Sequence, residues 1–301
     1  MVDAPTRLAA PTCAVCGAGI VGHVSVRLKG AGLYTCRVCG SWTYFPRAAA
    51  REQAAIHDCQ GYFEHPYFKV RRVAVEAQRR RCRGVFARLF DAADVSSLRG
   101  QRMLDIGCDT GAFLKVAQDE FGIVPVGLDV AERSINLAKA GGVEAYQASI
   151  EEAPPELTDF QLITAIDLIE HVVDPHGFLQ EIWKRLRPGG LLYVETPNIH
   201  SAVYRFGRTL SKVTGGRPSG LFERLFPPQH IQYFTERSFE RLALDTGYEV
   251  VSLGTRSLQG ADIAASFFAV ASVEALQILD RLKGNGILMC AVLRRPMQGI
   301  E

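Results

Sequence analysis

The stretch MLDIGCDTG (residues 103–111) is the part of the sequence that decides the fold. Its apolar first half is typical of a buried parallel strand, and Gly107 and Gly111 bracket a tight turn before a helical pattern that begins at Ala112. A strand, a glycine loop and a helix in this order present backbone N–H groups at a helix N-terminus, where the chain can approach a polar ligand closely. We therefore expect a nucleotide-type ligand at this turn.

A second strand narrows the choice of ligand. The apolar run VPVGL (124–128) ends in Asp129, 22 residues after Gly107. A carboxylate at this place can accept both hydroxyls of a ribose, as in dinucleotide-binding βαβ units. The loop lacks the Gly-x-Gly-x-x-Gly pattern of those units, and Asp105 lies in the strand just before the turn. An acid there would repel a pyrophosphate but suits the ammonium group of an amino acid, which favours S-adenosylmethionine (SAM) over NAD.

Beyond residue 101, strand and helix patterns alternate, which indicates an α/β fold with a mostly parallel sheet covered by helices on both faces. We expect strands near 102–106, 124–128, 144–147, 160–166 and 190–195, and helices near 111–121, 132–140, 175–187 and 235–246. Apolar runs at 248–253 and 287–293 complete a Rossmann-like sheet of seven strands. The expected organisation is a leader (1–12), a small metal-bound ribbon with strands near 24–28 and 42–45 (13–45), a mostly helical segment (46–94), and a main domain (95–301) with inserts near 199–230 and 255–285.

Four cysteines near the N-terminus form a metal-binding pattern. The pairs Cys13-x2-Cys16 and Cys36-x2-Cys39 are separated by 19 residues, and a glycine follows each pair. This spacing is typical of a zinc ribbon, and four thiolates form a closed tetrahedral site without the open position that catalysis needs. A redox dithiol pair or two disulfides fit the spacing and the expected compartment less well. We predict a structural Zn²⁺ here.

Bulk composition excludes several classes of protein. The 301 residues are 48% hydrophobic and 22% charged, with a net charge of +2. Neither the composition nor the net charge therefore indicates nucleic acid or a membrane as a partner. No apolar run approaches the roughly 18 residues of a membrane span, and the N-terminus has no apolar signal segment. We therefore expect a cytoplasmic protein, in which the cysteines are reduced.

Taken together and in order, the motifs resemble those of class I SAM-dependent methyltransferases, in particular the ubiquinone-type O-methyltransferases and sugar-modifying methyltransferases. They are LDIGCDTG (104–111), GLD (127–129), DLIEHVVDP (167–175), LRPGGLL (186–192), ETPN (195–198) and HIQYFT (230–235). The resemblance implies that the last strand of the sheet runs antiparallel. One departure is Asp109, which stands where the family often has glycine.

The resemblance also implies the residues of the SAM site. Asp105, Gly107, Gly111 and Asp129 would bind the cofactor, and Val130 would pack beside the adenine. Ser149 and Ile150 follow the third strand, where the family usually has an acidic and an apolar contact to the adenine, so Ser149 implies a weaker hydrogen bond. Tyr62, which precedes the main domain, would cover the methionine end of SAM or simply pack in the core.

Candidate catalytic residues follow the fourth strand. Asp167, Glu170 and His171 have i, i+3, i+4 spacing, which would direct all three towards the methyl group if a helical turn begins there. His230 lies in a loop that could reach the same place. In one interpretation His171 or His230 is the general base. In the other, Asp167, Glu170, His171 and His230 bind a second divalent cation that lowers the pKa of a coordinated hydroxyl. This arrangement resembles that of the ubiquinone-type O-methyltransferases and the small-RNA 2′-O-methyltransferases. A purely structural role for Glu170 and His171 at the strand–helix junction remains a further alternative.

The sequence thus predicts a SAM-dependent methyltransferase that acts on a small polar metabolite, with a sugar or another hydroxylated natural-product intermediate as first choice. One alternative is an RNA methyltransferase that uses the ribbon to hold nucleic acid, which the near-neutral charge and the lack of aromatic and basic clustering in residues 13–45 disfavour. Another is a non-catalytic regulatory protein that binds SAM and zinc.

Overall fold

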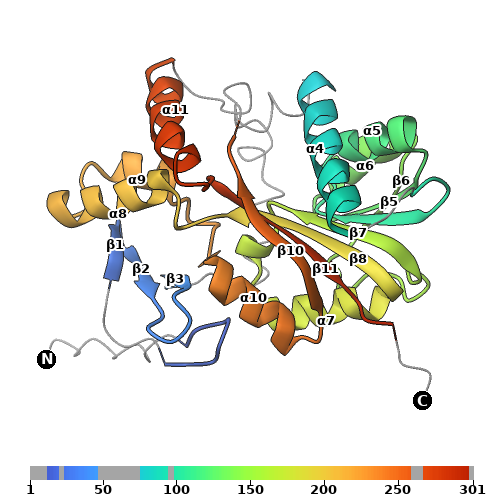
Figure 1. Ribbon diagram of the computed structural model, residues 1–301, viewed down its shortest axis with the longest axis horizontal. Helices are drawn as coiled ribbons and strands as arrows, with labels where there is room; N and C mark the ends of the chain where they lie inside the picture. Colours follow the sequence, from blue (N-terminus) through green and yellow to red (C-terminus); the bar gives the residue numbers. More distant parts are fainter. Residues whose placement is uncertain (1–11, 20–23, 47–74, 94–97, 259–266, 298–301) are drawn as a thin grey trace, which may run out of the picture.

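The central sheet of the computed structural model has seven strands in the order β10-β11-β8-β7-β4-β5-β6 (Figure 1). The structure describes residues 12–19, 24–46, 75–93, 98–258 and 267–297. Strands β4 to β8 are parallel to one another, whereas β11 is antiparallel to both β8 and β10. The seven-stranded, mostly parallel sheet with an antiparallel last strand is therefore confirmed. Its strands are β4 (Arg102–Ile106), β5 (Val124–Asp129), β6 (Glu144–Gln147), β7 (Phe160–Ile166), β8 (Leu186–Pro197), β10 (Glu249–Arg256) and β11 (Leu288–Arg294).

Helices cover both faces of this sheet because side chains on successive strand residues point to opposite faces (Figure 1). In β4, Leu104 and Ile106 join one apolar cluster and Met103 joins the other. The first cluster includes side chains of α7 (Pro175–Arg185) and α10 (Glu236–Asp245). The second includes side chains of α4 (Val75–Ala93), α5 (Ala112–Phe121) and α6 (Glu132–Ala140). The carboxyl ends of the parallel strands remain uncovered by these two layers, as a ligand site in such a fold requires.

Most predicted element boundaries lie within one or two residues of the observed ones. The largest difference is β8, which begins at Leu186 and not near 190, because Leu186 pairs with Phe160 ahead of the irregularity in the β7–β8 ladder. Helix α10 begins where its sequence caps it: the Thr235 side chain accepts a hydrogen bond from the backbone of Ser238, and the Ser238 hydroxyl accepts one from the backbone of Thr235.

The cysteine-rich segment forms a second, four-stranded sheet in the order β1-β2-β3-β9. The strands β1 (Val24–Leu28), β2 (Ala31–Thr35) and β3 (Trp42–Phe45) belong to the ribbon, whereas β9 (Gln232–Tyr233) comes from the main domain. One face of the ribbon shares an apolar cluster with two helices of the 199–230 insert, α8 (Ala202–Thr214) and α9 (Ser219–Leu225). The ribbon is thus built into the main domain by both strand pairing and a common core.

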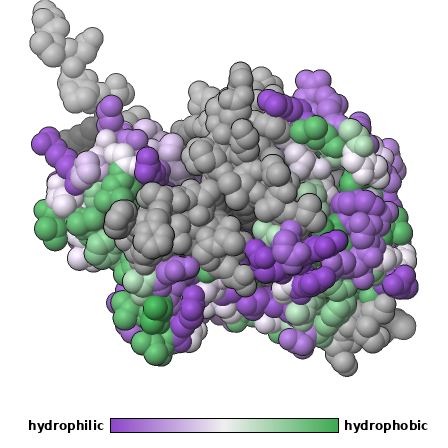
Figure 2. All heavy atoms as spheres, turned by 90° about the horizontal axis from the view of Figure 1, so that it is seen from above, coloured by the Kyte–Doolittle hydropathy of each residue, from purple (hydrophilic) through white to green (hydrophobic). Residues whose placement is uncertain are grey.

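Other expectations concern segments at the margins of the described chain. The predicted insert near 255–285 contains the helix α11 (Phe267–Arg281), while most of the leader and the first part of the helical segment lie outside the described residues. Among the residues that the structure describes, no helix is long and apolar enough to cross a membrane. Figure 2 shows hydrophobic atoms gathered over the end of the molecule that carries α8 and α9, where Phe206, Val213 and Leu221 are exposed.

Candidate functional site

The glycine loop after β4 adopts backbone conformations that favour glycine. Gly107 and Gly111 have φ angles of +76° and +73°. A Cβ atom at Gly107 would lie 3.3 Å from the side chain of Leu168, and one at Gly111 would lie 3.2 Å from Cβ of Ala138. Gly111 is also the N-cap of α5. The loop therefore needs glycine both for its left-handed turns and for its close approach to neighbouring elements.

Asp129 lies at the end of β5 and is oriented by the loop that it faces. One carboxylate oxygen accepts a hydrogen bond from the backbone N–H of Asp109 (2.9 Å), and the other accepts one from Ala131 (2.9 Å). A carboxylate offers about four acceptor positions, so these two bonds do not by themselves saturate it. This geometry suits the predicted contact with a ribose.

Asp105 is buried within β4, where its carboxylate accepts a hydrogen bond from the Thr164 hydroxyl (2.6 Å). Burial raises the pKa of this carboxyl from 3.8 to about 7, against the smaller lowering effects of the Thr164 bond and of Arg81. An ionised carboxylate in such a place gains most from a cationic ligand group, because little water is present to solvate it.

These residues surround a cavity of about 330 Å³ at the carboxyl edge of the sheet. The cavity is lined by eight of the predicted site residues: Asp105, Gly107, Asp129, Val130, Ser149, Ile150, Asp167 and His171. Gly111 does not line it but shapes the loop that does. Tyr62 lies outside the described residues, so its predicted role stays a prediction.

Glu170, His171 and His230 form a second group of side chains, and His171 also lines the cavity. The ligand atoms of Glu170, His171 and His230 all lie within 4.8 Å of one another. The rings of His171 and His230 meet edge to face with centroids 4.7 Å apart, and Nδ1 of His171 is 2.9 Å from the carbonyl oxygen of Gln229. The loop with His230 therefore does reach the segment after β7, as the sequence suggested.

Glu170 is the buried member of this group, with 1% of its surface exposed. One of its oxygens accepts a hydrogen bond from the Thr196 hydroxyl (2.8 Å), and the other has no hydrogen-bond partner among the described residues. Burial raises the pKa of this carboxyl well above its ordinary value. A buried carboxylate oxygen without a donor, beside two imidazoles, is the donor set that a divalent cation such as Mn²⁺ or Zn²⁺ accepts.

Asp167 turns away from the other three residues. The helical turn after β7 is a 3-10 turn that begins only at Ile169, and Asp167 precedes it with a φ angle of +54°. Its carboxylate forms an ion pair with Arg81 of α4 (2.6 Å), and its backbone N–H donates to the carbonyl oxygen of Glu195 (2.8 Å). Asp167 thus lines the cofactor cavity but lies outside the group formed by Glu170 and the two histidines.

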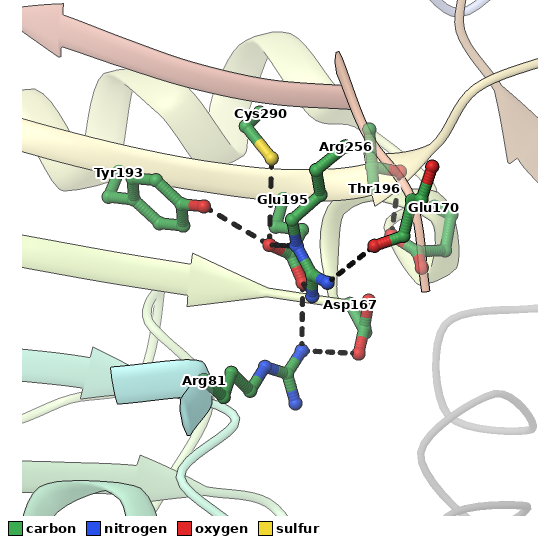
Figure 3. A network of polar contacts seen from close by, with 9 residues as sticks. Arg81, Asp167, Glu170, Tyr193, Glu195, Thr196, Arg256 and Cys290 are labelled. Carbon is green, nitrogen blue, oxygen red and sulfur yellow. Dashed lines mark hydrogen bonds and ion pairs between the residues drawn. The ribbon is translucent and has the colours of Figure 1, made fainter. Parts of the chain in front are cut away.

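The same arginine leads to a buried network that sequence spacing did not reveal (Figure 3). Glu195 is fully buried and accepts hydrogen bonds from Arg81 (3.1 Å), Arg256 (2.6 and 2.8 Å) and the Tyr193 hydroxyl (3.1 Å). Although burial opposes ionisation, the guanidinium groups of Arg256 and Arg81 lower the pKa of Glu195. The partners come from α4, β8 and β10, which are far apart in the sequence, so only the fold brings them together.

The four ribbon cysteines fit a zinc ion. Their sulfur atoms lie within 4.8 Å of one another, and the Cys13–Cys39 and Cys16–Cys36 pairs are each 3.5 Å apart. A Zn–S bond of about 2.3 Å places the sulfurs of a tetrahedron about 3.8 Å apart, so only small adjustments are needed. The hydrogen bond from the Cys39 thiol lowers the pKa of the Cys13 thiol to about 4, whereas the same bond and burial raise the pKa of the Cys39 thiol.

Comparisons with known proteins agree with this geometry. The family model described as "Methyltransferase domain" matches residues 74–253, more than half of the chain. Curated relatives are the ubiquinone biosynthesis O-methyltransferases of Bordetella avium (32% identity, 36% of this chain and 48% of the relative) and Rhizobium rhizogenes (37% identity, 36% and 46%). The chain therefore spans about half the length of the curated relatives it matches.

Solved structures share the fold at low sequence identity. Phosphoethanolamine N-methyltransferase 2 of Haemonchus contortus in complex with SAM has a TM-score of 0.59 at 16% identity, over 85% of this chain and 63% of that one. A SAM-dependent methyltransferase from Archaeoglobus fulgidus has a TM-score of 0.52 at 17% identity, over 74% and 95%. The predicted family is confirmed: the chain belongs to the class I SAM-dependent methyltransferases.

Proposed function

We propose that the protein transfers the methyl group of SAM to a hydroxyl of a small polar acceptor, and that His171 and His230 govern removal of the hydroxyl proton. The observation that carries this proposal is the meeting of Glu170, His171 and His230 at the edge of the cofactor cavity. The names of the curated relatives, which are O-methyltransferases, support oxygen as the methylated atom.

SAM supplies a methyl group on a positively charged sulfonium, which an aligned nucleophile displaces. For its part, the chain orients the cofactor through Asp105 and Asp129 and aligns the acceptor at the cavity edge. An imidazole is suited to accept the acceptor's proton because its pKa lies near neutrality, and His171 is oriented by its contact with the Gln229 carbonyl. If that carbonyl accepts from Nδ1, then Nε2 is the unprotonated ring nitrogen that can take the proton.

The same side chains support the metal-assisted alternative. Glu170, His171 and His230 would hold a divalent cation, which would lower the pKa of a hydroxyl bound to it. Asp167, proposed at first as a further ligand, is engaged by Arg81 and lies outside this group. Its contribution, on this proposal, is to help shape the cofactor cavity.

We further propose a structural role for the ribbon zinc and a reducing, cytoplasmic location, because four thiolate ligands persist best where thiols stay reduced. The RNA-methyltransferase alternative receives less support. The outer edge of β3, which a ribbon could offer to a nucleic acid, is paired with β9 of the main domain.

The test is turnover with labelled SAM against a panel of phenols, sugars and nucleotide sugars. We expect one acceptor class to react, and His171→Ala or His230→Ala to lower kcat by about 10²–10⁴ at nearly unchanged SAM affinity. His200→Ala is the matched control, since His200 is exposed and lies outside the group. If a metal acts, a chelator abolishes turnover while the ribbon zinc remains, and Mg²⁺ or Mn²⁺ restores it. Full activity of both histidine variants would contradict the proposal.

A further inference from the structure

The ribbon contacts the candidate catalytic group through the short strand β9. Residues Gln232 and Tyr233, two and three positions after His230, pair with Thr43 and Trp42 of β3. The backbone N–H of Tyr44 continues the ladder by donating to the carbonyl oxygen of Ile231 (2.9 Å). The Thr43 hydroxyl adds a side-chain bond to the amide oxygen of Gln232 (3.2 Å).

The other edge of the same segment faces the turn that carries Glu170 and His171. The backbone N–H of Ile231 donates to the carbonyl oxygen of Glu170 (2.9 Å), and the carbonyl oxygen of Gln229 contacts Nδ1 of His171 (2.9 Å). Residues 229–233 therefore form a bridge, with the ribbon on one side and the candidate catalytic turn on the other. His230 lies within this bridge, so its position depends on both sides.

The ribbon side of the bridge is held firmly. Thr43, Gln232 and Tyr233 are completely buried, and the ring of Trp42 packs against those of Phe226 and Tyr233, with centroid distances of 6.3 and 6.5 Å. A β-strand of only two residues cannot be stable by itself, so its register must come from the partner strand. The partner here is β3.

The metal-binding cysteines fix the start of β3. The Cys36–Cys39 turn closes with a bond from the N–H of Cys36 to the carbonyl oxygen of Ser41, directly before Trp42. The Ser41 hydroxyl lies 3.2 and 3.1 Å from the sulfur atoms of Cys13 and Cys39. Elsewhere the ribbon is anchored to α7, where Nε2 of His176 contacts the carbonyl oxygen of Val15 (2.8 Å).

We propose that the ribbon is a positioning element of the catalytic site: through β3, and through Thr43 in particular, it holds residues 229–233 so that His230 faces His171. This inference rests on the proposed role of the two histidines. It assigns to the zinc-binding segment a task within the reaction of the main domain, in contrast to the binding of a separate partner.

The test combines hydrogen exchange with kinetics on the full chain. Replacing Cys13 and Cys16 together by Ser, which removes the ribbon zinc, should raise amide exchange in peptides that cover 229–234, whereas peptides of the glycine loop (104–113) and the SAM affinity stay unchanged. Thr43→Val removes the hydroxyl but keeps the shape of the side chain. We expect it to lower kcat about two- to tenfold, the range for one neutral hydrogen bond, with little change in acceptor KM or SAM affinity.

Two further variants separate positioning from general stability. Thr43→Ser keeps the hydroxyl and should restore kcat. Ser25→Ala removes a hydrogen bond to Thr35 elsewhere in the ribbon and should leave kcat unchanged. Unchanged exchange in 229–234 after zinc removal, or a Ser25→Ala loss equal to that of Thr43→Val, would overturn the inference. Because exchange requires no acceptor, it still reports on positioning if His230→Ala proves fully active and the proposed function fails.

Discussion

Replacing Asp105 by asparagine should stabilise the ligand-free protein and weaken its binding of SAM. The substitution keeps the size of the side chain and an oxygen that can accept the hydrogen bond of Thr164. It removes only the ionisable group, whose pKa burial raises from 3.8 to about 7. The effects on stability and on binding should therefore have opposite signs and a common cause.

The direction of the pH dependence follows from linkage. A carboxyl whose pKa is higher in the folded than in the unfolded state binds more protons when folded, so stability falls as pH rises between the two pKa values. For Asp105 this window runs from about pH 4 to about pH 7. A difference of roughly three units corresponds to about 4 kcal/mol at pH 8, an upper bound because local relaxation lessens the cost.

The assay is chemical denaturation of the ligand-free wild type and Asp105→Asn at several pH values, with SAM binding measured by calorimetry. We expect equal stability near pH 4 and an Asp105→Asn protein that is about 2–4 kcal/mol more stable at pH 8. SAM binding should weaken by about 1.5–3 kcal/mol, the scale of a hydrogen bond to a charged group. Asp119→Asn is the control, since Asp119 is an exposed residue that pairs with Lys115. Parallel stability curves for wild type and variant from pH 4 to pH 8 would refute the reasoning.

Three further outcomes can be measured on the same protein. Asp129→Ala should weaken SAM binding by about 2–3 kcal/mol in calorimetry, because the ribose loses its charged acceptor, and an unchanged affinity would contradict that role. Purified protein should contain one zinc per chain by elemental analysis. Replacing Cys13 and Cys16 together by Ser should remove this zinc and unfold residues 13–45. Absence of zinc from protein purified without any chelator would refute the site. Arg256→Met should lower the free energy of unfolding by about 3–5 kcal/mol, since it leaves the buried Glu195 carboxylate with one guanidinium fewer, and a stability within 1 kcal/mol of wild type would contradict this.

The sheet and its covering helices could be predicted from the sequence because most strands of the main domain are apolar runs, and β4, β5, β7 and β8 end at or directly before glycine, proline or an acid. The carboxyl-end rule then places Asp105 and Asp129 at one edge, and both line the cavity. The helices α8 and α9 were not predicted in the 199–230 insert. Much of their apolar surface faces the ribbon, so it stabilises them only once the ribbon is in place.

Sequence patterns could not predict strand β9 or the network around Glu195, for a different reason. Two residues carry no periodicity, and β9 exists only because β3 supplies its partner. Arg81 and Arg256 are 114 and 61 residues from Glu195 in the sequence. The sequence around an arginine does not indicate which distant carboxylate it will pair with. The turn after β7 begins only at Ile169, and Asp167 lies before it with a φ angle of +54°, so the spacing of Asp167 and Glu170 did not place them on one face.

The charges at the carboxyl edge of the sheet explain why the site suits a cation. Several carboxyl groups gather there: Asp105, Asp109, Asp129, Glu151 and Asp167 line the cavity, and Glu170 and Glu195 lie beside it. Arg81 and Arg256 neutralise Asp167 and Glu195, and burial favours the protonated form of Glu170. Asp105, Asp109 and Asp129 lie on the side where the glycine loop meets the cavity, so negative charge is concentrated there. A ligand with a positive charge at that end is attracted, whereas a pyrophosphate would be repelled by these acids. The half-buried Arg81 and Arg256 therefore contribute to the electrostatic preference of the site, because they neutralise the acids that lie away from the glycine loop.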